Sequence, residues 1–143
     1  MAKAKILVVD DEKMTVSIVT GVLKKHGYEV YAAYNGVTGL EKAKEVLPDL
    51  IILDIMMPLM DGYEVSYRLK NSALTAKIPV LMLTAKGGVD DPDTRKSWEA
   101  AERIKDRLQG FDSGAVEFVT KPIKASDLVK RVKFILWSGG MGL

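Results

Sequence analysis

The stretch that decides the fold is DLIILDIMMP, residues 49–58. Its apolar residues 50–53 run without alternation, which is typical of a strand buried on both faces of a parallel sheet. Asp54 follows this run directly. A carboxylate there is a costly core residue, a cap for the next loop, or part of a crevice where open α/β sheets bind ligands. Pro58 and the Asp61–Gly62 pair then indicate a loop.

The rest of the chain alternates between strand and helix patterns. Further strands are predicted over residues 5–9, 28–33, 78–83 and 115–119, and helices over 14–25, 37–47, from about 62, over 94–112 and around 128–136. Five strand–helix alternations predict an α/β fold, with a parallel sheet covered by helices on both faces. We expect one domain over residues 1–143, with 138–143 as a flexible tail or the start of a linker.

Composition excludes several classes of protein. The chain has 143 residues, 48% of them hydrophobic and 28% charged, and a net charge of +2 without a basic run, so no direct nucleic-acid partner is expected. No apolar run approaches the roughly 20 residues of a membrane span. The absence of cysteine excludes disulfides, zinc–thiolate sites and cysteine nucleophiles, and fits a cytoplasmic location.

Polar side chains follow four of the predicted strands: Asp10 with Asp11, Asp54, Thr84 and Lys121. The carboxyl ends of parallel strands lie on one edge of the sheet, so these groups are expected to meet there. Acids, a hydroxyl and one ammonium are what phosphoryl transfer to a carboxylate requires. Asp54 would be the nucleophile, and Thr84 and Lys121 would bind phosphoryl oxygens.

A divalent cation is needed to offset the repulsion between a carboxylate and a phosphoryl group. Mg²⁺ prefers oxygen ligands and keeps several waters. Asp11, Asp54 and a backbone carbonyl just after Asp54 could supply these oxygens, with Asp10 acting through water.

Four segments together resemble the receiver domain of two-component response regulators, the CheY-like family: ILVVDDE at 6–12, LDIMMPLMDG at 53–62, LTAK at 83–86 and VTKP at 119–122. The resemblance covers roughly residues 5–137. It implies a doubly wound, flavodoxin-like, five-stranded parallel sheet of order 2-1-3-4-5. It also implies that Asp54 accepts a phosphoryl group from a histidine kinase or phosphotransfer protein, in a signalling protein rather than an enzyme. Asp10, Asp11 and the Met56 carbonyl would be Mg²⁺ ligands beside Asp54.

Phe118 precedes Lys121 by three positions. The pattern alone indicates an aromatic residue in a half-buried strand. The resemblance implies in addition that Phe118 turns inward when Thr84 moves toward the phosphoryl group. That switch would reshape the face formed by the fourth helix, fifth strand and fifth helix, where a second copy or a downstream protein would bind.

The spacing departs from the family pattern between Thr84 and Lys121, which are 121 − 84 = 37 positions apart. We expect an insertion of roughly fifteen residues within 86–107, too long for routine loop variation. The predicted result is an extended fourth helix or an inserted loop, with Trp98 as a candidate partner surface.

Three other functions compete with this interpretation. A phosphatase of the haloacid-dehalogenase type would have an acid two residues after its nucleophile, where this chain has Met56. A flavodoxin-type binding module would need a neutral phosphate loop where this chain has Asp10, Asp11 and Glu12. A receiver-like module that acts without phosphorylation stays open.

Overall fold

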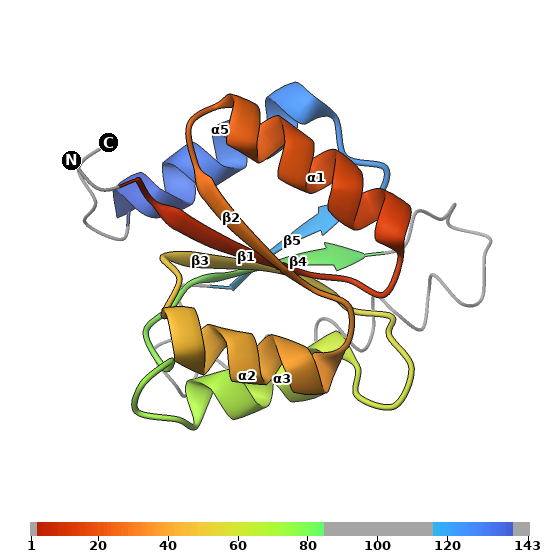
Figure 1. Ribbon diagram of the computed structural model, residues 1–143, viewed down its shortest axis with the longest axis vertical. Helices are drawn as coiled ribbons and strands as arrows, with labels where there is room; N and C mark the ends of the chain where they lie inside the picture. Colours follow the sequence, from red (N-terminus) through yellow and green to blue (C-terminus); the bar gives the residue numbers. More distant parts are fainter. Residues whose placement is uncertain (1–2, 85–115, 139–143) are drawn as a thin grey trace.

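Five parallel strands form a single sheet in a computed structural model of the chain, which describes residues 3–84 and 116–138 (Figure 1). The strands are β1 (Lys5–Val9), β2 (Glu29–Ala33), β3 (Leu50–Asp54), β4 (Val80–Thr84) and β5 (Val116–Thr120). Their order is β2-β1-β3-β4-β5. The predicted flavodoxin-like topology is therefore confirmed. The predicted insertion at 86–107, the long fourth helix, Trp98 and the tail after residue 138 lie outside the described residues.

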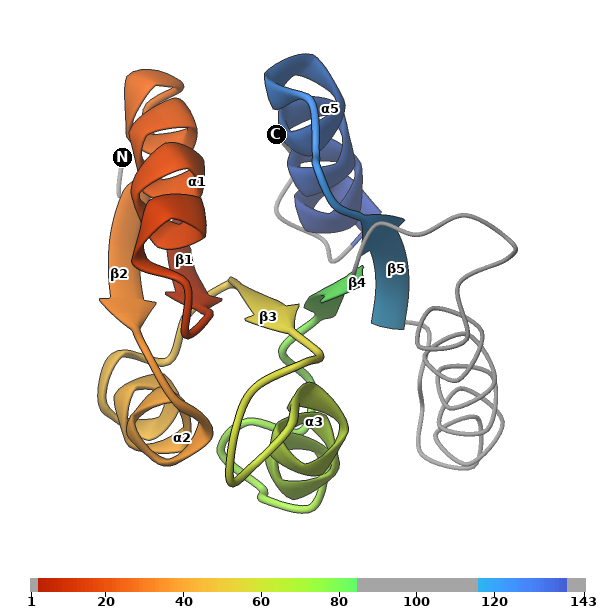
Figure 2. The same cartoon turned by 90° about the vertical axis from the view of Figure 1, so that its right-hand side faces the viewer.

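The described helices cover the sheet in two layers (Figure 2). On one face lie α1 (Lys13–Lys25) and α5 (Ala125–Leu136), and on the other lie α2 (Gly36–Val46) and α3 (Gly62–Lys70). Among the described residues, no helix has the length and apolar character needed to cross a membrane.

The central strands are buried on both faces because each side of the sheet has its own core. Leu50 and Ile52 pack into the core under α1 and α5, while Ile51 and Leu53 pack into the core against α2 and α3. All five residues of β3 are buried. This two-sided burial explains why the sequence of β3 shows no polar alternation. By contrast, β2 lies at the edge and only its last residue is buried.

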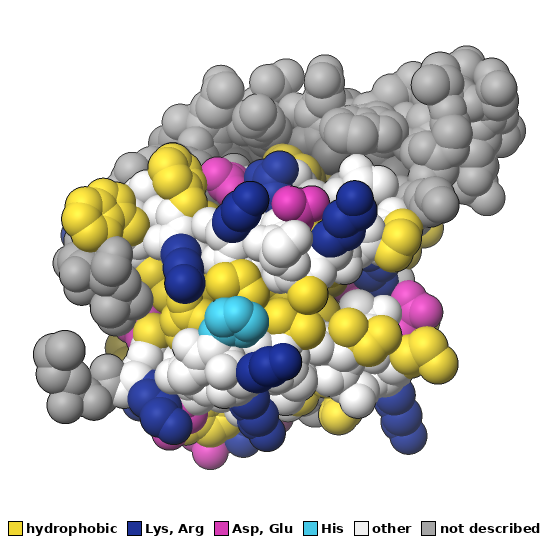
Figure 3. All heavy atoms as spheres, turned by 90° about the horizontal axis from the view of Figure 1, so that it is seen from above, with side chains coloured by type: hydrophobic (Ala, Val, Ile, Leu, Met, Phe, Trp, Pro, Cys, Tyr) yellow, Lys and Arg dark blue, Asp and Glu magenta, His cyan; other side chains and the backbone are white. Residues whose placement is uncertain are grey.

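Local signals set where the helices begin and end. Asn35 and Asp61 are the N-caps of α2 and α3, and each side chain accepts a backbone N–H three residues on, at 2.9 Å. Gly27 adopts a φ of 90° just after α1, a conformation that favours glycine. The outward surfaces of α1 and α5 carry exposed lysine and arginine side chains around an apolar strip (Figure 3).

Two glycines in helices have opposite surroundings. A Cβ on Gly39, in α2, would lie 2.9 Å from a methyl group of Val9 in β1, so this glycine lets the helix approach the sheet closely. A Cβ on Gly21, in α1, would meet no atom within 4 Å. Comparing Gly21 with Gly39 therefore distinguishes the low helix propensity of glycine, which both share, from the close packing that only Gly39 allows.

We predict opposite stability changes for alanine at these two positions. Gly21→Ala should stabilise the protein by about 0.5–1 kcal/mol, because alanine is the better helix former and no atom obstructs it. Gly39→Ala should destabilise it by about 1–2 kcal/mol, because crowding against the buried Val9 outweighs the same helical gain. Urea unfolding of both variants measures this, and a stabilised Gly39→Ala would show that α2 can shift without cost.

Candidate functional site

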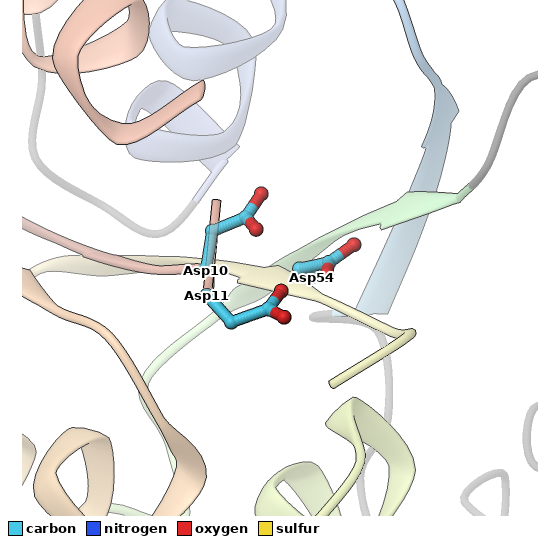
Figure 4. Close-up of side chains that lie close together, drawn as sticks. All are labelled: Asp10, Asp11 and Asp54. Atoms are coloured by element: carbon cyan, nitrogen blue, oxygen red, sulfur yellow. The ribbon is translucent and has the colours of Figure 1, made fainter. Parts of the chain in front are cut away.

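The sheet register brings the acids of the two central strands together. Val9 pairs with Leu53, so Asp10, the residue after β1, lies beside Asp54 at the end of β3. Figure 4 shows Asp10 and Asp11 reaching from the end of β1 toward the same region as Asp54. One oxygen from each of these three carboxylates lies within 4.8 Å of the others. Asp10 and Asp54 are buried and Asp11 is exposed, so the predicted acidic cluster opens to solvent on the Asp11 side.

Lys121 supplies the positive charge of the site. It follows β5, and its backbone N–H donates to the carbonyl oxygen of Thr84 at 2.8 Å. Its Nζ lies close to three carboxylate oxygens: 2.9 Å from Asp10 Oδ2, 3.1 Å from Glu12 Oε1 and 3.2 Å from Asp54 Oδ1. The Lys121 side chain is 18% exposed. Three carboxylates thus surround one ammonium, and Glu12 Oε1 accepts a hydrogen bond from it.

Burial and crowding of like charge disturb the protonation of the site. Burial, and after it the charge of Asp10, raises the pKa of Asp54 to about 7, although Lys121 acts in the opposite direction. Burial by itself lowers the pKa of Lys121, but Asp10 and Asp54 outweigh it and hold that pKa above its ordinary value. The ammonium of Lys121 therefore stays charged, while the pKa of the Asp54 carboxyl lies close to neutral pH.

The arrangement of oxygens fits a divalent cation. Asp10 Oδ1 accepts the backbone N–H of Glu12 at 2.9 Å. Asp10 Oδ2 is buried and has no hydrogen bond within the described residues, although Lys121 Nζ lies 2.9 Å away as its ion-pair partner. A buried carboxylate oxygen with remaining capacity, beside Asp11 and Asp54, suits Mg²⁺, which binds oxygen ligands. The acidic triad could therefore hold a metal. The Met56 side chain is 57% exposed, and coordination by its carbonyl stays a prediction.

The hydroxyl of Thr84 lies at the same edge, at the end of β4. Thr84 is buried, and the single proton of its Oγ1 hydroxyl is available to two acceptors, the Val119 carbonyl and the Thr120 hydroxyl, each at the long distance of 3.4 Å. Phe118 pairs in register with Met82, is half-buried, and packs against the core on the α2 and α3 side. Side chains two residues apart on a strand share a face, so Thr84 and Phe118 lie on the same face of neighbouring strands. Their roles in switching stay predictions.

Gly62 holds the loop after β3 against the site. A Cβ on Gly62 would clash with the carbonyl oxygen of Asp54, and the Gly62 N–H donates to the Ile55 carbonyl at 2.9 Å. The sequence indicates a loop break here, but not that the helix start packs directly on the backbone of Asp54. Only glycine fits this close approach.

Glu12 is the site residue that sequence reasoning missed. The sequence assigns Asp10 and Asp11 to a metal site, but nothing in it indicates that the Glu12 side chain contacts Lys121. The two residues are 109 positions apart, and their contact depends on how β1 and β5 lie across the sheet.

The geometry of the strand ends agrees with the comparison to known families. A family model for the response regulator receiver domain matches residues 6–133. The chain belongs to this family. Its acidic pocket of Asp10, Asp11 and Asp54 is typical of the phosphoacceptor site of a receiver domain.

Several proteins are similar to this receiver domain. The DNA-binding dual master transcriptional regulator RpaA of Synechocystis is 39% identical over 132 residues, which are 92% of this chain and 48% of RpaA. Response regulator PleD of Caulobacter vibrioides is 42% identical over 130 residues, 91% of this chain and 25% of PleD. The chain thus spans about half or less of these two relatives. Protein PilH of Pseudomonas aeruginosa is 34% identical over 133 residues, 93% of this chain and 98% of PilH.

Solved structures share the receiver fold. Chemotaxis response regulator CheY4 of Vibrio cholerae has a TM-score of 0.75 and 28% identity, over 94% of this chain and 99% of CheY4. A CheY-like receiver domain protein of Methanospirillum hungatei has a TM-score of 0.77 over 99% of this chain and 100% of that chain. At 21% identity, this second likeness supports the fold alone.

We predict that Asp54→Asn stabilises the metal-free protein in a pH-dependent way. Because the pKa of Asp54 is raised from 3.8 to about 7, the folded protein holds a proton that the unfolded chain has lost between these values. The stability of the parent therefore falls as pH rises through this window. Asparagine does not titrate, so the variant should be more stable above pH 7 by up to about 4 kcal/mol, and the difference should shrink toward pH 4.

Urea unfolding in EDTA, from pH 4 to pH 8, measures this difference. The exposed Asp127 is the control, because Asp127→Asn removes a solvent-screened carboxylate and should change stability far less than Asp54→Asn does. An Asp54→Asn variant that loses stability relative to the parent as pH rises would contradict the sign of the shift.

Proposed function

We propose that Asp54 accepts a phosphoryl group from a phosphohistidine of a histidine kinase or phosphotransfer protein. The observation that carries this proposal is the convergence on Asp54 of Asp10, Asp11 and Lys121 at one sheet edge. Asp54 is only 3% exposed, yet it lies beside the exposed Asp11, so a donor can approach from that side. Membership of the receiver family supports a signalling phosphoacceptor rather than a true enzyme.

The transfer is a displacement at phosphorus. A carboxylate oxygen of Asp54 forms the O–P bond while the P–N bond to the donor histidine breaks, and the electron pair of that bond leaves with the histidine nitrogen. Asp10, Asp11, Asp54 and the Met56 carbonyl would hold Mg²⁺. When bound, Mg²⁺ offsets the negative charge between the carboxylates and the phosphoryl group. Lys121 then donates to a phosphoryl oxygen, with its charge secured by its raised pKa.

The switch proposed for this domain uses the weak bonds of Thr84. Hydrogen bonds at 3.4 Å are long, so the Oγ1 hydroxyl can exchange them for a shorter bond to a phosphoryl oxygen at little cost. Movement of Thr84 changes the space beside Phe118, which is half-buried and shares its face. Phosphorylation would then bias two arrangements of Phe118 and the surface around β5 and α5.

The donor would contact an apolar rim around the site. Met14 in the first turn of α1, and Met56 and Leu59 in the loop after β3, are among the exposed large hydrophobic residues. All three belong to segments that follow strands at the edge where Asp54 lies. Exposed apolar side chains beside a reactive group favour docking of a protein partner.

Acetyl phosphate tests the assignment without a kinase. With Mg²⁺ it should add one phosphoryl mass to the parent, because its small size lets it reach Asp54 directly. Asp54→Asn should gain none, because the amide is not a nucleophile. Mass spectrometry of the intact protein measures the adduct.

The matched control is Asp127→Asn, an exposed aspartate in the first turn of α5, which should label like the parent. EDTA should abolish labelling of the parent. Equal labelling of parent and Asp54→Asn would refute the assignment. An unlabelled parent would favour a receiver that acts without phosphorylation.

We predict that Lys121→Arg separates labelling from switching. Arginine keeps the positive charge, but its planar guanidinium cannot reproduce the compact contacts at 2.9–3.2 Å to three carboxylates. Labelling of Asp54 should persist, while the phosphorylation-induced NMR shifts around Phe118 should be at least halved. Lys130→Arg, on the exposed side of α5, is the control. A shift pattern like that of the parent would show that Lys121 does not link the phosphoryl group to Phe118.

A further inference from the structure

The side chain of Glu12 turns away from the helix that it precedes. Glu12 is the N-cap residue of α1, yet its side chain makes no capping hydrogen bond, and no acidic residue lies in the first turn of α1. N-cap side chains normally accept a helix N–H. Glu12 Oε1 instead lies 3.1 Å from Lys121 Nζ and accepts its hydrogen bond. Capping of α1 does not explain the contact between Glu12 and Lys121. The contact therefore indicates that Glu12 has a role at the site.

Glu12 differs from the other two partners of Lys121. Asp10 and Asp54 are buried members of the acidic triad, whereas the Glu12 side chain is 63% exposed and lies outside the triad. Lys121 Nζ already lies 2.9–3.2 Å from three carboxylate oxygens. A phosphoryl oxygen on Asp54 that gains Lys121 therefore competes with these partners for the ammonium, and among them Glu12 is the one that accepts a hydrogen bond at the solvent-exposed side.

We propose that Glu12 is a positioning residue that holds Lys121 in its resting arrangement and competes with the phosphoryl group on Asp54 for the ammonium. This inference rests on the proposed function, because it assigns Lys121 to the phosphoryl group in the phosphorylated state. Glu12 then lowers the affinity of the site for a phosphoryl group. It shifts the balance between the resting and switched arrangements through Lys121 alone.

Glu12 can compete with a phosphoryl group for Lys121 because its backbone is held by hydrogen bonds while its carboxylate lies at the solvent-exposed side of the site. Its N–H donates to Asp10 Oδ1 at 2.9 Å, and its carbonyl accepts the N–H of Val16 at 3.1 Å. The carboxylate can therefore release Lys121 without moving the metal-binding acids. Ion pairs that are partly exposed are weak, so the contact can be exchanged rather than locked.

Beryllofluoride, a phosphoryl analogue that binds without turnover, tests this inference. Its affinity at saturating Mg²⁺ is measured by NMR titration of the ¹⁵N-labelled full chain. Glu12→Gln should tighten binding by about 3- to 5-fold, the upper part of the range expected for loss of one partly exposed ion pair. Glu41→Gln, which removes an exposed charge on α2, should leave the affinity within about 2-fold of the parent.

Two further variants separate the contact from the charge. Glu12→Asp keeps the charge but is one methylene shorter, and aspartate at an N-cap turns to the helix N–H groups, so it should also tighten binding. In a Lys121→Ala background, Glu12→Gln should have less than about a 2-fold effect, because the residue that it acts through is gone.

Each outcome decides between contact and charge. If Glu12→Gln binds beryllofluoride more tightly but Glu12→Asp does not, simple charge repulsion explains the effect and the inference is overturned. The inference is also overturned if Glu12→Gln changes the affinity equally with Lys121 and in the Lys121→Ala background. Unchanged or weaker binding by Glu12→Gln in a protein that acetyl phosphate still labels would overturn the role of Glu12 alone. A parent that is neither labelled nor able to bind beryllofluoride would overturn the proposed function, and the role of Glu12 with it.

Discussion

The contact of one ammonium with three carboxylates is the interaction on which this site depends. Asp10 and Asp54 are buried side by side, an arrangement in which desolvation, and after it the repulsion from Asp10, raises the pKa of Asp54 to about 7. Lys121, at 2.9 Å and 3.2 Å from them, offsets part of that cost. The carboxylates of the site therefore carry more negative charge than the single ammonium of Lys121 can neutralise. A ligand that changes the charge of the site can change which carboxylates Lys121 contacts.

The parallel sheet is what makes such a site possible. Asp10 and Asp54 follow neighbouring central strands, and Thr84 and Lys121 follow the next pair, so four chain segments deliver their polar groups to one edge. Burial of β1, β3 and β4 between two cores fixes their register, because a slip by one residue would exchange the two faces. The cores that stabilise the fold thus also set the distances within the site.

The balance of contacts around Lys121 links the chemistry of Asp54 to the proposed switch. Within the described part of the chain, the hydroxyl of Thr84 makes long hydrogen bonds, and Glu12 contributes a contact that is partly exposed. Weak contacts of this kind can be exchanged when a phosphoryl group arrives, whereas the buried cores cannot rearrange at comparable cost. In the proposed switch, the sheet would stay rigid and the change would be confined to residues around its carboxyl edge.

The amino-acid sequence by itself determined the fold class, the strand order through the family resemblance, and the identity of Asp10, Asp11, Asp54, Thr84 and Lys121 as residues of one edge. The fold class and the edge residues follow from hydrophobic period and from strand ends, which are local properties, whereas the strand order rests on the family resemblance. The tertiary structure alone decided that Glu12 contacts Lys121 and that Gly62 packs on the backbone of Asp54. The raised pKa of Asp54 likewise depends on burial among distant segments. These contacts and the pKa shift depend on distances of a few ångströms between residues that are not adjacent in the sequence, and the sequence does not reveal such proximity.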